Sequence, residues 1–193
     1  MARSTGCRIR NNLGVALVLA SFAASAQAPD AVKLCESCHG PGGNSATAKV
    51  PSLAGQPATF LENQLVYFRE ELRPAPVMQA IVKGMKDEDI TALAKHFAAQ
   101  TPAAPAGAPD AAAAERGKAL AAKLHCGQCH LPDFRGQGQM ARLAGQREDY
   151  LADALFGYRD GQRGGADTTM SEVLYGVGDD DLKVLAKYLS RLK

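Results

Sequence analysis

The sequence predicts an all-α fold that is built twice from one small helical domain. Apolar residues recur at the three- and four-residue spacing of a helix face in both halves of the chain. The second half also repeats the first at an offset of about 91 residues, and each half carries the same short cysteine–histidine motif. No stretch shows the alternation of apolar and polar residues that is typical of a strand.

Residues 1–28 are predicted to be a cleaved signal peptide. Three arginines precede an uncharged apolar run over residues 13–24, and Ala26-Gln27-Ala28 has the small-x-small pattern of a signal peptidase site. An uncleaved anchor is the alternative, but this run is short for a bilayer span, which takes about 20 residues. We therefore expect an exported protein with no membrane span after cleavage.

The charge of the mature chain argues against a nucleic-acid partner. The full sequence has 22 basic and 20 acidic residues, and the three arginines of the predicted signal peptide leave with it. The balance that remains is close to neutral, whereas a nucleic-acid-binding protein shows a basic patch or stripe.

The internal repeat defines two predicted domains, residues 29–100 and residues 115–193. The stretch "SLAGQ" at 52–56 aligns with "RLAGQ" at 142–146, and "DEDITALAKHF" from Asp87 aligns with "DDDLKVLAKYL" from Asp179. Between the copies, "TPAAPAGAPDAAAA" at 101–114 is predicted to be a linker whose alanine end leads into a helix beginning near Asp110. Domains this small usually need a disulfide, metal or cofactor for stability.

The helices of both copies are predicted from spacing and from acidic starts. Asp87–Asp89 and Asp179–Asp181 suit the first turn of a helix, where carboxylates favour the positive end of the dipole. The residues at helical spacing are Leu61, Leu65, Phe68 and Leu72, then Ile90, Leu93, Ala94 and Phe97, and in the second copy Leu151, Leu155, Tyr158, Leu182, Leu185, Leu189 and Leu192.

The repeated motif is Cys-x-x-Cys-His, in "LCESCHG" at 34–40 and "HCGQCHL" at 125–131. This is the covalent attachment signature of c-type haem, in which both thiols bond to the porphyrin and the histidine becomes the proximal iron ligand. The sequence therefore predicts two covalently attached haem c groups. Their residues are Cys35, Cys38 and His39 for the first, and Cys126, Cys129 and His130 for the second.

A redox disulfide and a zinc site are the competing interpretations of a Cys-x-x-Cys pair. A thioredoxin-like motif needs a strand–helix context, which the sequence lacks. A four-cysteine zinc site would have to join two motifs that each sit in their own repeat. Neither alternative explains a histidine at the same place twice.

The sixth iron ligand is predicted from the repeat. Methionine is the expected partner in cytochromes c, and Met78 aligns with Met170, whereas Met85 and Met140 align with valines. The alternative role of any methionine is to fill the core, which we expect of Met85 and Met140. His96 and His125 are expected to be ordinary helix residues.

The order of motifs resembles the cytochrome c4 family of dihaem cytochromes over the whole mature chain. The first copy reads "CESCHG", "GNS", "PSLAGQ", "FLENQL", "MQAIVKGM" and "DEDITALA". The resemblance implies two tandem class I cytochrome c domains, each wrapped around a haem, with the haems facing each other across a domain interface. It supports the axial pairs His39/Met78 and His130/Met170. It also implies that the Pro51 carbonyl, whose counterpart is Ala141, accepts the imidazole N–H of His39.

Two pairs of arginines are equivalent between the copies, Arg69 with Arg159 and Arg73 with Arg163. Guanidinium groups match carboxylates well, so these residues are candidates to neutralise haem propionates. A solvated helix face is the alternative, and repetition alone does not decide between the two.

Three functions are considered for a protein with two haems whose irons are both predicted to be six-coordinate. The first is a periplasmic carrier of single electrons, without catalytic activity, that links a quinol-oxidising complex to a terminal oxidase or a dehydrogenase. The second is a tightly bound electron-transfer subunit of an oxidoreductase, such as a flavocytochrome sulfide dehydrogenase. A haem peroxidase ranks last, because it needs an iron that can lose its sixth ligand. The unequal loops "PGGNSATAKVPS" and "PDFRGQGQMAR" predict two unequal redox potentials.

Overall fold

The structure is a computed structural model that describes Met1, residues 28–105, Gly107, residues 111–165 and residues 168–193. Within these residues the only β feature is an isolated bridge between Gln137 and Met140, so the all-α prediction is confirmed. The elements are α1 (Ala28–His39), η1 (Pro41–Gly43), α2 (Ala58–Arg69), α3 (Pro76–Val82), α4 (Asp87–Ala98), α5 (Ala111–Lys123), α6 (Cys126–His130), α7 (Glu148–Arg159), α8 (Thr169–Leu174) and α9 (Asp179–Ser190).

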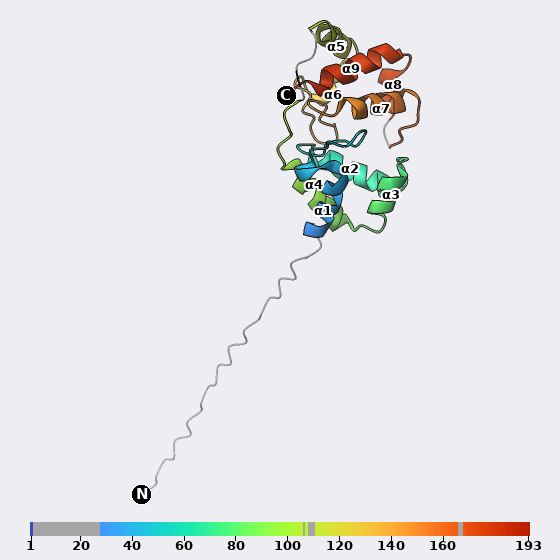
Figure 1. The fold of residues 1–193 in the computed structure, drawn as a ribbon. Coiled ribbons are helices and arrows are strands. Elements are labelled where there is room, and N and C mark those ends of the chain that lie inside the picture. The colour runs from blue at the N-terminus through green and yellow to red at the C-terminus, as the bar shows by residue number, and fades with distance from the viewer. Residues whose placement is uncertain (2–27, 106, 108–110, 166–167) are drawn as a thin grey trace.

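The helices form two groups that follow the sequence repeat. We call α1 to α4 the first bundle and α5 to α9 the second bundle. Figure 1 shows the two bundles stacked against each other, with the segment after α4 leading from one to the other. α5 begins at Ala111, close to the helix start near Asp110 that the alanine run predicts.

Each bundle has its own apolar core. In the first bundle, α2 packs on α4, and α1 packs on α4 as well. In the second bundle, α9 packs against both α5 and α7. The buried core residues are Leu61, Leu93, Ala94 and Phe97 in the first bundle, and Leu151, Leu155, Leu174, Leu182, Leu185, Ala186 and Leu189 among those of the second. All of these except Leu174 and Ala186 are positions that helical spacing selects, so the pattern that predicts the helices also identifies most of the cores.

Two apolar residues that spacing assigns to helices lie outside them. Leu72 follows the end of α2 at Arg69 and is 53% exposed, and Leu192 follows the end of α9 at Ser190. The chain leaves α2 through Glu71, whose φ is 58°, and the Arg73 N–H then bonds to the carbonyl of Tyr67. This left-handed turn ends the helix before Leu72 can join its apolar face.

Close packing in the second bundle depends on Gly117 of α5. A Cβ atom at this position would lie 2.2 Å from the Cβ of Tyr188 in α9 and 3.3 Å from the Val184 carbonyl oxygen. Glycine therefore lets the two helices approach at this point.

Among the described residues, no helix combines the length and the apolar character that a membrane span requires. The predicted signal peptide, residues 1–28, lies outside the described residues except for Met1 and Ala28. Export therefore stays a prediction.

Candidate haem sites

The two Cys-x-x-Cys-His motifs occupy short helical turns in the two bundles. Cys35, Cys38 and His39 form the end of α1, and Cys126 to His130 form α6. All four thiols are free of disulfides. The residues after the histidines, Gly40 and Leu131, both have positive φ, so each helix ends immediately behind its histidine.

The two histidines are held in the same way. The Nδ1–H of His39 donates to the carbonyl of Pro51 at 2.8 Å, and the Nδ1–H of His130 donates to the carbonyl of Ala141 at 2.8 Å. The contact that the resemblance implies for Pro51 is thus confirmed, and its counterpart is present in the second bundle. Because each Nδ1 is engaged by a backbone carbonyl, each Nε2 is left to bind a metal, and the ring orientation is fixed.

Burial sets the protonation of these motifs. His39 is 7% exposed and His130 is 8% exposed, and burial lowers the pKa of both imidazoles despite the backbone hydrogen bonds. A low pKa keeps an imidazole neutral, which is the form that binds iron. Burial also raises the pKa of the Cys35 and Cys126 thiols.

In the second bundle, one cavity of about 300 Å³ brings together the residues predicted to hold the second haem. Its lining includes Cys126, Cys129, His130 and Met170, the last from α8. Leucines of α7 and α9 complete the apolar wall, including Leu155 and Leu189. The cavity therefore joins two thiols, an oriented imidazole and a thioether in mainly apolar surroundings, which is the donor set that a six-coordinate haem c requires.

In the first bundle, Met78 lies in α3 and is partly exposed. Met85 packs against the core cluster of this bundle, in agreement with its expected core role. The pairing of Met78 with His39 stays a prediction, supported by the equivalence of α3 and α8.

Two expectations about the second bundle are wrong. His125 is not a helix residue: it has a φ of 54°, immediately precedes α6, and lines the cavity. Met140, which we expected in the core, also lines the cavity. The chain breaks between α5 and α6, which takes His125 out of the helix, whereas α1 runs without interruption into its motif.

The equivalent arginines separate into two kinds. Arg69 pairs with Glu70 and Asp87 and donates to the carbonyl of Met85 at 3.0 Å. Arg159 repeats this arrangement with Asp160, Asp179 and the Val177 carbonyl. These two residues tie the end of one helix to the acidic start of another, so they serve the fold.

Arg73 and Arg163 instead meet where the bundles touch. Arg73 of the first bundle donates to Gln64 and to the hydroxyl of Tyr150, the latter at 3.3 Å. Arg163 of the second bundle donates to the same hydroxyl at 2.8 Å. Burial raises the pKa of Tyr150, but the two guanidiniums outweigh it and lower this pKa to about 8.

A pair of glutamines joins the bundles, and the repeat alone did not indicate this role. Gln146 accepts from the Ser52 N–H and donates to the Ser52 carbonyl, both at 2.8 Å. Gln56 does the same to Arg142, at 2.9 and 2.8 Å. We call these four hydrogen bonds the glutamine clamp. The glutamine that ends each "LAGQ" stretch bonds to the backbone of the residue just before the other "LAGQ" stretch. Such a reciprocal contact is what a two-fold axis produces.

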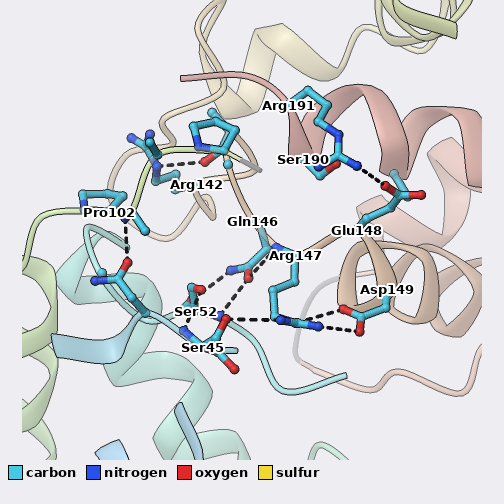
Figure 2. Close-up of a pocket in the computed structure, with 18 of the residues that line it drawn as sticks. Ser45, Ser52, Pro102, Arg142, Gln146, Arg147, Glu148, Asp149, Ser190 and Arg191 are labelled. Carbon is cyan, nitrogen blue, oxygen red and sulfur yellow. Dashed lines mark hydrogen bonds and ion pairs between the residues drawn. The ribbon is translucent and has the colours of Figure 1, made fainter. Parts of the chain in front are cut away.

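The clamp lies beside a pocket of about 540 Å³ between the bundles (Figure 2). In Figure 2, Gln146 reaches Ser52, while Arg147 bridges Ser45 and Asp149. Arg191 pairs with Glu148 on another wall. The polar side chains that line the pocket therefore bond to one another, and the pocket is part of the joint between the bundles.

The fold and the two sites together define a class of protein. Two small helical bundles, each with a Cys-x-x-Cys-His motif whose histidine is oriented through Nδ1, are the construction of a c-type cytochrome with two haems.

Comparison with known proteins agrees. The cytochrome c family model matches residues 114–193. Cytochrome c4 of Azotobacter vinelandii is 32% identical, covering 90% of this chain and 90% of its own. The thiosulfate dehydrogenase electron acceptor of Thiomonas intermedia strain K12 is 33% identical, covering 91% of this chain and 86% of its own. The crystal structure of reduced cytochrome c4 from Pseudomonas stutzeri superposes with a TM-score of 0.78 at 28% identity, covering 86% of this chain and 98% of its own.

The chain belongs to the cytochrome c4 family. It is a dihaem electron-transfer cytochrome with covalently bound haem c, and its role is to carry electrons rather than to catalyse a reaction. When bound, the haem supplies a one-electron ferric–ferrous couple, while the protein sets its ligands, its burial and its hydrogen bonds.

Proposed function

We propose that this cytochrome is exported to the periplasm and there passes single electrons between redox proteins. Residues 1–28 would be the cleaved signal, residues 29–100 and 115–193 the two haem domains, and residues 101–114 their linker. The proposed attachment residues are Cys35, Cys38, Cys126 and Cys129, and the proposed iron ligands are His39 with Met78 and His130 with Met170.

The observation that carries this proposal is the cavity of the second bundle. It collects Cys126, Cys129 and His130 from α6 and Met170 from α8. A filled fifth and sixth coordination position leaves no open site for a substrate, which supports outer-sphere transfer through a haem edge. The donor would be a quinol-oxidising complex, and the acceptor a terminal oxidase or another periplasmic oxidoreductase.

Methionine variants of the holoprotein test the ligands. Met170→Ala should remove half of the methionine–ferric haem signal in magnetic circular dichroism and lower one midpoint potential, because a thioether ligand raises the potential. Met78→Ala should remove the other half. Met140→Ala and Met85→Ala are the matched controls. Loss of the signal in Met140→Ala, with Met170→Ala unchanged, would transfer the ligand role to Met140.

Cell fractionation tests the location. The mature protein should be recovered in the periplasmic fraction, and its mass should correspond to a chain that begins at Pro29 and carries two haems. A full-length chain retained with the membranes would contradict the cleaved signal.

A second candidate is a dihaem electron-transfer subunit held permanently by an oxidoreductase. The relative from Thiomonas intermedia is described as the electron acceptor of thiosulfate dehydrogenase, and this fits the candidate. Gel filtration of a gently prepared periplasmic extract, followed by mass spectrometry of the haem fractions, separates the two. Elution at the monomer mass supports the free carrier, and stoichiometric co-elution with a dehydrogenase supports the subunit.

A further inference from the structure

Arg73 and Arg163 place two positive charges at the contact between the bundles without an acidic partner among the described residues. Arg73 donates to Gln64 and to Tyr150, and Arg163 donates to Tyr150, so the acceptors are uncharged side chains. The Nε of Arg163 is buried and has no hydrogen-bond partner. A buried guanidinium without a counter-charge is costly, so this cluster needs an anion.

The cluster faces the second haem site. Gln64, Tyr150 and Arg163 all line the cavity that also contains His130 and Met170. Gln64 belongs to α2 of the first bundle, and Phe60, Asn63 and Tyr67 of the same helix line the cavity as well. The first bundle therefore forms part of the wall of the second haem site.

Aromatic rings hold both guanidiniums in place. The guanidinium carbon of Arg73 lies 4.5 Å from the centroid of the Phe68 ring, and that of Arg163 lies 4.9 Å from the centroid of the Tyr158 ring. Phe68 and Tyr158 are equivalent in the repeat, so each copy positions its arginine by the same cation–π contact. The Tyr150 hydroxyl breaks this symmetry, because its counterpart is Phe60.

We propose that Arg73, Arg163 and the Tyr150 hydroxyl form one shared site for the propionate carboxylates of the haems, so that each arginine influences both haems. This inference rests on the proposed function, because it requires a haem at each motif. Haem carries carboxylates, and a planar guanidinium binds a carboxylate through two parallel hydrogen bonds. The shared hydroxyl makes the two cations a single unit across the interface.

The direction of the effect follows from charge. Reduction lowers the charge of a haem iron by one, so a nearby cation favours the ferrous state. Replacing either arginine with glutamine should lower the reduction constants of both haems by about threefold to tenfold, where tenfold is about 59 mV for a one-electron couple.

The test measures both midpoint potentials of Arg73→Gln and Arg163→Gln by spectroelectrochemical titration. Arg69→Gln and Arg159→Gln are matched controls, because they remove the same charge from ion pairs that serve the fold. Two covalent haems by mass spectrometry, with the methionine signal intact, are required of every sample.

The result expected is that each interface variant lowers both potentials, while the controls lower neither to the same extent. A shift of only one potential in each variant would overturn the shared site, since each arginine would then serve its own haem. Potentials that do not move would overturn the propionate contact and leave the proposed function intact. Loss of covalent haem already in the wild-type protein would overturn the proposed function itself.

If the arginine variants do not mature, Tyr150→Phe decides the question. It keeps both charges and the ring but removes the hydroxyl that both guanidiniums contact, so both potentials should shift. Tyr67→Phe is its control, because Tyr67 lines the same cavity while the arginine hydrogen bonds go to the Tyr150 hydroxyl. Unchanged potentials in Tyr150→Phe would overturn the proposal.

Discussion

Replacing Gln146 with alanine should loosen the joint between the two bundles. Gln146 is 5% exposed and makes two hydrogen bonds of 2.8 Å to the backbone of Ser52. A typical intramolecular hydrogen bond contributes about 1 kcal/mol net, and a buried backbone group left without a partner costs more. The substitution should therefore lower the free energy of unfolding by about 2 to 3 kcal/mol.

Urea unfolding of the ferric holoprotein, followed by far-ultraviolet circular dichroism, measures this loss. Gln56→Ala should cost a similar amount, because Gln56 bonds to Arg142 in the same way and is 4% exposed. The double variant should cost less than the two single losses together, because one broken half already opens the joint. Gln162→Ala, at an exposed residue, is the control. Single variants that match this control would refute the clamp as a stabilising contact.

Two other substitutions test the fold around the sites. Gly117→Ala should destabilise the second bundle by about 1 to 3 kcal/mol, because the new Cβ would overlap the Tyr188 side chain; thermal unfolding checks this, and an unchanged midpoint would contradict it. The Arg147 side chain, with the N–H groups of Lys49 and Tyr150, outweighs burial and lowers the pKa of Asp149 to about 2, below the usual 3.8. The ionised carboxylate thus contributes stability above pH 4 that is lost as the pH falls towards 2. Asp149→Asn should remove this contribution, so stability measured from pH 6 to pH 2 should fall less steeply than in the wild type; an equal acid dependence would refute the assignment.

Local patterns predicted the helices and much of the cores, because both depend on residues near one another in the chain, whereas the contact of His39 with Pro51 was implied by the family resemblance. Ile90, Leu93, Ala94 and Phe97 are buried as their spacing indicates, and Pro51 accepts the His39 N–H. The repeat could not show that Gln56 and Gln146 cross between copies, because aligned residues do not reveal which copy they contact. Likewise, the sequence shows Glu70 directly after Arg69 but does not show that Arg73 reaches Tyr150 of the other copy.

The break before α6 also escaped sequence analysis, because it depends on the φ of a single residue, His125. Spacing alone continued the helix through this position, as it does in α1. The break reaches the site, since His125 lines the cavity of the second bundle.

The two halves are equivalent in the glutamine clamp and differ at Tyr150 and at the break before α6. The glutamine clamp obeys the two-fold symmetry of the duplication, with matching bonds in both directions. Tyr150 departs from it, because its counterpart in the repeat is Phe60, and so does the break at His125. Unequal surroundings are expected to give the two haems unequal potentials, because burial and hydrogen bonds tune the potential of each iron. Two distinct midpoints in a redox titration of the wild-type protein are therefore expected, and a single midpoint for both haems would show that these departures leave the potentials equal.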